Sequence, residues 1–437
     1  MMEVKPFKAF RFDPGAVGDV GSCISPPYDV ISPTEQRQLY EKSKYNIVRI
    51  IKGKTTSFDN DDNNQYTRAA DYLKTWIEKG VLRQDSNESI YAYVQDFELA
   101  GSKIRRSNFI ALARLEEFGK TVRPHEETLD EPKIDRLNLK RATVAKFGLV
   151  FMLYEDRQKI ADKIIEDAER QTPLIDCIDE QDVRHRLFAI TAKEGIDAIA
   201  GMMVDKDCII ADGHHRYETA LNYYKETNNP AARYQMAAFV NTRNEGLMIL
   251  ATHRLVETLE NFQFEKVIVA LKQNFEVTEF RFDSSQAKIE AKQKMLARMK
   301  GEVDRDKNAL GIYGGNNTFY VAVLKDKRAM DSAASNMSNA WKSLNVSVLH
   351  KLVLEKLLGI GEKELASGGN VEYIKDTGSA VDESIAKVDN GRKQIAFFVS
   401  PPKMQQLKMV TDAGEKMPQK STYFYPKVYT GLTINKL

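Results

Sequence analysis

The chain has 437 residues, enough for two or three domains of about 150 residues each. Its 64 Lys and Arg residues nearly balance its 62 Asp and Glu residues, and a net charge of +2 gives no electrostatic reason to bind nucleic acid or an acidic membrane. Three scattered cysteines exclude a disulfide framework, and no apolar run approaches the roughly 20 residues that cross a bilayer. Because no leading apolar segment resembles a secretion signal either, we expect a soluble protein of the cytoplasm.

The first third of the sequence mixes strand and helix patterns, which predicts an α+β (mixed α/β) fold. In chain order we expect a strand at 7–12, a proline-rich loop at 25–32, a strand at 45–51, a polar loop at 55–65, a helix at 66–79 and a hairpin formed by 90–97 and 107–115. Ser32 or Thr34 can cap the helix after the proline-rich loop, and Gly101 marks the hairpin turn.

Residues 123–136 are dense with ionisable side chains yet show no apolar period. Such a segment is typical either of an exposed loop or of a binding site. Helical segments are expected from residue 135 onward, followed by a strand at 148–154, further helices and a strand at 184–190.

The most informative stretch is 208–221, which reads as a buried strand that runs directly into a helix. Asp212 and Gly213 supply turn chemistry between the two, and glycine lets a ligand approach the backbone closely. The first N–H groups of a helix have no partners within the helix, so this junction favours an anion. His214, His215 and Arg216 add side-chain donors at the same point.

Two simpler interpretations of this stretch remain open at the level of sequence. Asp212 can be an N-cap only, with the two histidines in a solvated first turn. A metal site is less favoured because neighbouring helix positions diverge by roughly 100° and cannot easily bind one ion together. Cys208 lies in the apolar strand, where a thiol is usually packed and unreactive.

After this junction we expect strands at 234–241 and 247–252, with His253 and Arg254 closing the second strand. Beyond residue 260 we expect a helix at 284–300, a hairpin formed by 310–313 and 318–324, helices at 326–344 and 346–358, and a strand at 394–399. The predicted regions are 1–120, 121–258 and 259–437. The aromatic-rich tail at 417–427 either seals the core as a strand or presents Lys420 and Lys427 to an anion.

Five separated motifs carry a family resemblance: SPPYDVIS at 25–32, HEETLDEPKIDR at 125–136, ADGHHRYETA at 211–220, THRL at 252–255 and MPQKSTYFYPK at 417–427. Together they resemble the bacterial and archaeal domain-of-unknown-function family 1015. The resemblance extends from near residue 7 to near residue 435.

The DGHHR stretch is also similar to the G-x-H-R phosphate loop of the ParB and sulfiredoxin-like nucleotide-binding fold, whose members include free-standing serine kinases. This resemblance implies a ParB/sulfiredoxin-like core that binds ATP or ADP with Mg²⁺. Asp212, Gly213, His215 and Arg216 match the loop, and His214 occupies its variable position. The resemblance also implies a distant carboxylate that activates the acceptor hydroxyl, for which Glu126 is the candidate and Asp29 the reserve.

The resulting hypothesis is a phosphotransferase that acts between a nucleotide and a small hydroxy amino acid, with serine and phosphoserine as the leading pair in either direction. The expected catalytic residues are Asp212, which also binds the metal, Glu126 and His125. The expected nucleotide- and phosphate-binding residues are Gly213, His214, His215, Arg216, His253, Arg254, Lys133 and Lys420.

A non-catalytic nucleotide or phosphometabolite sensor that uses the same loop is the alternative hypothesis. We do not expect nucleic-acid binding, because charge is balanced and no basic recognition helix stands out. A homodimer is one hypothesis for the assembly.

Overall fold

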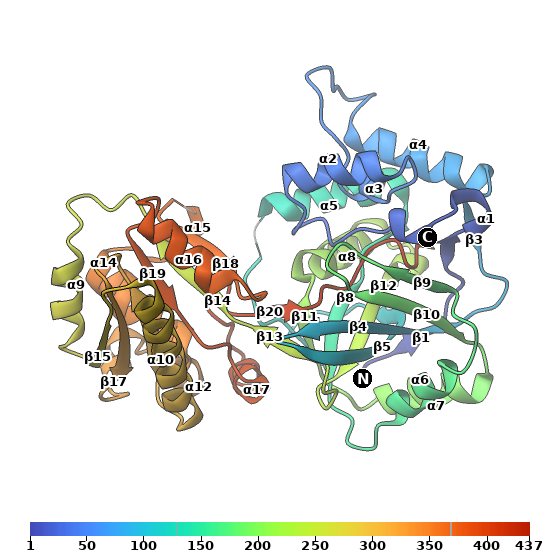
Figure 1. The fold of residues 1–437 in the computed structure, drawn as a ribbon. Coiled ribbons are helices and arrows are strands. Elements are labelled where there is room, and N and C mark those ends of the chain that lie inside the picture. Colours follow the sequence, from blue (N-terminus) through green and yellow to red (C-terminus); the bar gives the residue numbers. More distant parts are fainter. Residues whose placement is uncertain (129, 368) are drawn as a thin grey trace. The chain divides into compact units, whose positions relative to one another are not determined.

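The computed structural model describes residues 1–128, 130–367 and 369–437, and the chain forms two compact units (Figure 1). Unit 1 comprises Met1–Met248 and Pro426–Leu437, and unit 2 comprises Ile249–Tyr425. The sequence suggested three regions, of which the first two, 1–120 and 121–258, contribute strands to one sheet in unit 1. Leu129, inside the HEETLDEPKIDR motif, lies outside the described residues.

Unit 1 is built on a nine-stranded mixed sheet with the order β6-β11-β8-β12-β5-β4-β10-β9 and with β1 paired to β5. Its strands are β1 (Val4–Lys5), β4 (Ile90–Leu99), β5 (Ser102–Arg114), β6 (Val122–Arg123), β8 (Val150–Tyr154), β9 (Ile175–Ile178), β10 (Arg184–Ile190), β11 (Cys208–Asp212) and β12 (Tyr234–Asn241). Parallel pairs (β8 with β12, β6 with β11) occur beside antiparallel ones. The mixed sheet with its helices confirms the α+β class.

The helices of unit 1 are α1 (Pro14–Val17), α2 (Pro33–Lys42), α3 (Val48–Ile51), α4 (Gln65–Glu78), α5 (Asp130–Thr143), α6 (Ile160–Ala168), α7 (Lys193–Met203) and α8 (His214–Thr227). Helices α6 and α7 pack together below the sheet in Figure 1, with α6 against β4, β5 and β10 and α7 against β1. Helix α5 packs against α4 and α8. Two small sheets, β2 (Phe10–Phe12) with β3 (Leu82–Gln84) and β7 (Ala145–Lys146) with β21 (Asn435–Lys436), complete the unit.

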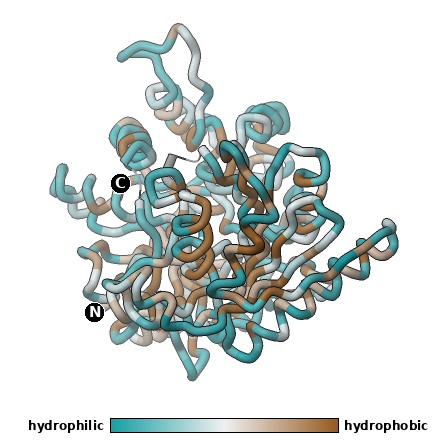
Figure 2. Tube along the Cα trace, turned by 90° about the vertical axis from the view of Figure 1, so that its left-hand side faces the viewer, coloured by the Kyte–Doolittle hydropathy of each residue, from teal (hydrophilic) through white to brown (hydrophobic). Residues whose placement is uncertain are grey.

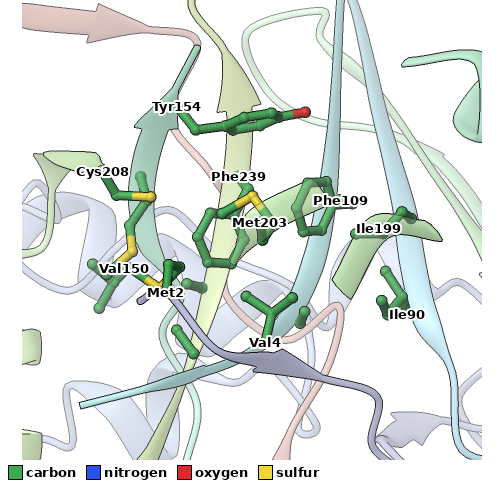
Figure 3. Close-up of a cluster of buried hydrophobic side chains, with 14 of the residues drawn as sticks. Met2, Val4, Ile90, Phe109, Val150, Tyr154, Ile199, Met203, Cys208 and Phe239 are labelled. Atoms are coloured by element: carbon green, nitrogen blue, oxygen red, sulfur yellow. The ribbon is translucent and has the colours of Figure 1, made fainter. Parts of the chain in front are cut away.

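The core of unit 1 surrounds the strands that lead to the DGHHR junction. The rings of Phe109 and Phe239 stack with centroids 4.9 Å apart, beside Tyr154 and Met203 (Figure 3). Cys208 lies in the same cluster with no exposed surface, and burial raises the pKa of its thiol, which fits a packed and unreactive cysteine. The packing of β11 in this core therefore fixes the position of its last residue, Asp212, within unit 1.

Several local predictions for the first third are confirmed, and one is wrong. Ser32 caps α2 in a capping box with Glu35, and the hairpin of β4 and β5 turns at Gly101. The predicted strand at 45–51 is instead the short helix α3, because the side chain of Asn46 accepts a hydrogen bond from the Val48 N–H at 2.9 Å and starts a helical turn. The polar loop before α4 projects at the top of Figure 1 and is mostly teal and white in Figure 2.

Unit 2 contains a six-stranded antiparallel sheet with the order β15-β17-β16-β19-β14-β18. The strands are β14 (Thr252–Val256), β15 (Phe275–Arg281), β16 (Ala309–Tyr313), β17 (Thr318–Leu324), β18 (Val371–Lys375) and β19 (Ile395–Phe398), and β13 (Met248–Leu250) pairs separately with β20 (Tyr423–Tyr425). The predicted hairpin of β16 and β17 is confirmed. His253 and Arg254 lie inside β14 and not at the end of the preceding strand.

The helices of unit 2 are α9 (Phe264–Leu271), α10 (Ser285–Asp304), α11 (Ala329–Ala333), α12 (Asn339–Lys342), α13 (Asn345–Val348), α14 (Lys356–Leu358), α15 (Glu362–Ser367), α16 (Ala380–Asp389) and α17 (Met404–Asp412). The two continuous helices expected at 326–344 and 346–358 are broken into short pieces, with a π-helix at Leu349–Glu355. Within the described residues, no helix combines the length and the apolar character needed to cross a bilayer.

Candidate functional site

The junction of β11 and α8 depends on the backbone conformation of Gly213. This residue has φ +90°, and a Cβ at its position would come within 3.0 Å of the guanidinium carbon of Arg216. Gly213 is the N-cap of the 14-residue helix α8, so no side chain occupies the cap, and the interpretation in which Asp212 is only an N-cap is wrong. Asp212 is the last residue of β11. The helix therefore presents the positive end of its dipole next to a carboxylate.

Asp212 is held between two cations. Its Oδ2 lies 3.3 Å from Nη2 of Arg216 and 3.4 Å from Nζ of Lys427. Burial opposes ionisation, but Lys427 and Arg216 outweigh it and hold the pKa of Asp212 well below its usual range. Arg216 also donates to the carbonyl of Leu149, and its Nη2 lies 4.0 Å from Oδ1 of Asp29. Burial favours a neutral Arg216, yet the charges of the two aspartates raise its pKa.

The HEET loop is fastened to this junction by two buried histidines. The backbone N–H of His125 donates to Nε2 of His214 at 3.2 Å, and Nδ1 of His125 lies 2.5 Å from the carbonyl oxygen of Ile210. Nδ1 of His125 must therefore carry a proton, and Nε2 of His214 must not. Burial lowers the pKa of His125. With 1% of its surface exposed, His125 holds the loop in position between β11 and α8.

His215 and Glu126 lie at the half-exposed side of the same corner. Burial lowers the pKa of His215, while the charges of Asp29 and Glu126 oppose that shift. Lys133 extends the cluster on α5, where its Nζ lies 2.9 Å from Asp130 and 3.4 Å from Glu218. The ion pair with Asp130 and the charge of Glu218 raise the pKa of Lys133 against the opposing effect of burial.

The structure thus gathers, within unit 1, the predicted residues Asp29, His125, Glu126, Lys133, Asp212, Gly213, His214, His215 and Arg216. We refer to these residues, together with Lys427 and Glu218, as the DGHHR corner. It contains three Lys or Arg cations and four carboxylates. Among the described residues no group of three or more His, Cys, Asp or Glu side chains could hold a metal by itself. Because Mg²⁺ is commonly bound by one or two carboxylates together with substrate phosphates, Asp212 fits as the single protein ligand of a metal that arrives with a nucleotide.

A cavity of about 60 Å³ lies on another side of Arg216. Its lining residues are Pro27, Tyr28, Ile51, Arg136, Leu139, Lys140, Ala145, Lys146, Phe147, Gly148, Arg216, Thr219, Gln235 and Thr430. The guanidinium of Arg136 stacks 3.9 Å from the ring centroid of Tyr28, and burial raises the pKa of Tyr28 to about 12. Both residues also line a larger groove of about 720 Å³ beside α2 and α5.

The sequence analysis missed most of this cavity. Arg136, Lys140 and Thr143 recur on one face of α5 together with the buried Leu139, a pattern that places cations among apolar neighbours. That pattern was the available signal. The pattern indicates a cavity only if this face of α5 is buried against α4 and α8, and the sequence of α5 alone does not predict that packing.

His253, Arg254 and Lys420 form a separate cluster in unit 2. Arg254 is fully buried and donates to the carbonyls of Gln419, at 3.1 Å, and of Lys420, at 2.9 Å, as well as to that of Thr252. His253 accepts a hydrogen bond from the Val399 N–H at 3.4 Å, and burial lowers its pKa to about 4. The structure does not place these three residues in the same unit as the DGHHR corner, so their predicted role at that anion site stays a prediction.

The fold and this corner define an α+β protein with a charged strand–helix junction, and comparison with known families agrees with the motifs. The family described as "Protein of unknown function (DUF1015)" matches residues 4–347. The chain belongs to this family, and the matched residues contain four of the five motifs; the motif at 417–427 lies beyond them.

Several solved structures are similar to the chain at low levels of identity. A free serine kinase in complex with AMP has a TM-score of 0.33 and 13% identity over 70% of this chain and 83% of that chain. SbnI with C-terminal truncation from Staphylococcus aureus has a TM-score of 0.35 and 10% identity over 75% and 87%. A conserved hypothetical protein from Pyrococcus furiosus has a TM-score of 0.31 and 15% identity over 70% and 89%. Among curated proteins no match is found.

Proposed function

We propose that the chain is a nucleotide-dependent phosphotransferase that moves a phosphoryl group between ATP or ADP and the hydroxyl of a small amino acid, with serine and phosphoserine as the leading pair. One observation carries the proposal. Arg216, Lys427 and the start of α8 converge on Asp212, next to the half-buried His215. Phosphoryl transfer requires above all the positioning and neutralisation of phosphate oxygens, and the donors of this arrangement supply the positioning and part of the neutralisation.

The proposed roles follow from exposure and charge. His215, Arg216 and the first backbone amides of α8 bind phosphate oxygens. Glu126 accepts the proton of the acceptor hydroxyl. The hydroxyl oxygen forms a bond to the transferred phosphorus, and the bond between that phosphorus and the nucleotide oxygen breaks. Lys133 binds the anionic group of the acceptor, and the buried His125 positions the HEET loop that carries Glu126.

The charge balance makes this corner dependent on a divalent cation. Four carboxylates face three cations here, so a polyphosphate would add negative charge to a site that is already slightly negative. Mg²⁺ would offset that charge at Asp212, which would have to share its ion pairs with Lys427 and Arg216. We therefore expect nucleotide affinity to fall at least tenfold when Mg²⁺ is removed with a chelator, as measured by calorimetric titration of ATP and ADP.

The activity test uses the full chain with serine, Mg²⁺ and either ATP or ADP, and follows phosphoserine by mass spectrometry. The reverse reaction starts from phosphoserine and nucleotide. We expect Asp212→Asn to lower kcat/KM about 1,000-fold or more, equivalent to about 4 kcal/mol. Glu126→Gln should lower kcat about 100-fold or more while nucleotide affinity is retained. Glu127→Gln, at the exposed neighbouring position, is the matched control and should keep wild-type turnover.

The outcomes separate the two hypotheses for this corner. No turnover in either direction with either nucleotide, from a protein that binds nucleotide through Arg216, would exclude the phosphotransferase and support the non-catalytic sensor. Neither binding nor turnover would exclude both. Size-exclusion chromatography with light scattering of the same samples would test the homodimer hypothesis.

A further inference from the structure

The cavity beside Arg216 is lined by four cationic side chains and by no carboxylate. The cations are Arg136, Lys140, Lys146 and Arg216, and none of the lining residues is Asp or Glu. Arg136 and Arg216 have carboxylate partners elsewhere, in Asp135 and Asp212. The two lysines have none among the described residues.

Lys140 lies on the buried face of α5 with 7% of its surface exposed. Its ammonium group makes one hydrogen bond, to Oε1 of Gln235 at 3.3 Å, and lies 5.7 Å from the ring centroid of Tyr223. It forms no ion pair with any carboxylate of the described residues. Burial lowers the pKa of Lys140 to about 7.

Lys146 lies in β7 with 3% of its surface exposed. It donates to the carbonyl of Ala231 at 3.1 Å and to Oδ1 of Asn435 at 2.8 Å, and within the described part of the chain it too has no carboxylate partner. Burial and the charge of Lys140 lower its pKa to about 6. A buried ammonium without a counter-charge is costly, and two that repel each other are more so.

The cavity has the size and polarity for an anion that would favour the charged forms of Lys140 and Lys146. A buried water needs about 10–15 Å³ by the same measure, so about 60 Å³ accommodates a few waters or one tetrahedral or planar oxyanion. Thr219 and Gln235 add neutral hydrogen-bonding groups to the lining. The cavity is partly open, so a ligand can enter it.

We propose that this cavity binds one small oxyanion, the phosphate or carboxylate group of a ligand, between Lys140, Lys146 and Arg216. The inference does not require phosphoryl transfer at Asp212. If phosphoryl transfer at Asp212 and anion binding in the cavity both occur, the two sites share Arg216. One ligand can then place an anionic group on each side of this guanidinium.

The test is calorimetric titration of the full chain with inorganic phosphate and, separately, with acetate, at constant ionic strength maintained with chloride. We expect saturable binding of at least one anion, and a Kd at least tenfold weaker in Lys140→Met and in Lys146→Met. Lys163→Met, at an exposed position of α6 without an ion pair to any described residue, is the matched control and should bind as wild type. The phosphate and acetate arms identify which oxyanion is preferred.

Two further measurements keep the result clear. Methionine is unbranched like lysine, is one atom shorter and removes a buried charge, so both variants should fold, which circular dichroism will show. Carbon NMR of the lysine side chains should show the pKa of Lys140 and Lys146 rising when the anion is added, an effect that a purely structural role would not produce. The proposal is overturned if the wild-type protein shows no saturable binding, or if both methionine variants bind the anion as tightly as wild type. Either result holds whatever the phosphotransfer assay shows.

Discussion

Two buried arginines, Arg216 in unit 1 and Arg254 in unit 2, belong to family motifs and yet have opposite surroundings. Arg216 is paired with Asp212 and lies near Asp29, so the charges of carboxylates raise its pKa. Arg254 has no ion pair with a carboxylate of the described residues; it donates to backbone carbonyls, and burial lowers its pKa to about 10.

The difference separates two uses of the same side chain. A ligand phosphate would compete with these carboxylates for Arg216, and a metal would compete with Arg216 for the carboxylates, so the partners of this arginine are of a kind that ligands can replace. The carbonyls around Arg254 are fixed parts of the chain, and the arginine connects β14 to the segment at 419–420. Membership of a motif therefore does not by itself separate an arginine paired with carboxylates from one that donates to backbone carbonyls.

The strongest test of this contrast is Arg254→Met. It leaves the carbonyls of Thr252, Gln419 and Lys420 without their donor, at about 1–3 kcal/mol for each buried group, so we expect the free energy of unfolding to fall by about 3 kcal/mol. Urea unfolding measures this, with nucleotide binding as the second readout. Arg328→Met, at an exposed pair with Asp326, is the control and should leave the stability at the wild-type value, because an exposed ion pair is screened by solvent. Unchanged stability with weakened nucleotide binding would reverse the assignment.

A second test uses pH and His253, which lies beside Arg254. Its folded-state pKa of about 4 is below the ordinary value of 6.5, so the unfolded chain binds the proton more readily. The contribution of a neutral His253 is complete above pH 6.5 and is lost progressively as the pH falls to about 4, by about 3 kcal/mol in total. Urea unfolding at pH 7 and pH 4.5 should show a smaller difference for His253→Gln than for wild type. Equal differences would show that His253 does not carry this dependence.

A smaller effect is expected from Gly213→Ala in the DGHHR corner. The positive φ disfavours alanine, and the new methyl group would meet the guanidinium of Arg216 at 3.0 Å, so we expect a loss of about 1–2 kcal/mol and a weakened nucleotide affinity. Thermal unfolding and ATP titration measure both. Gly201→Ala in α7, where no atom lies within 4 Å of the new methyl group, should instead stabilise the protein by about 0.5–1 kcal/mol.

The sequence predicted those features that depend on neighbouring residues. The apolar run 208–211 followed by glycine predicted β11 and α8, and Ser32 with Glu35 predicted the start of α2. The strand prediction at 45–51 failed because β-branched residues there suggested a strand, while one asparagine side chain starts a helical turn.

The composition of the site was predicted only in part. Asp212, His214, His215 and Arg216 are adjacent in sequence, whereas Glu126 and His125 are candidates from the HEET segment, to which no motif maps the distant carboxylate that the resemblance implies. The pairing of Lys427 with Asp212 and the convergence of Lys140 with Lys146 arise from contacts between distant segments. No periodicity within one segment encodes such contacts, which follow from the way the sheet of unit 1 brings its helices together.

Unit 2 is inserted between two parts of unit 1, since the chain leaves unit 1 after Met248 and returns at Pro426. During synthesis, Asp212 and Arg216 therefore emerge long before Lys427, and the last strand, β21, reaches its partner β7 later still. The chemistry of the corner is thus withheld from any nascent chain that has not yet reached Lys427, and maturation of the first unit waits for the synthesis of unit 2 and of the segment that follows it.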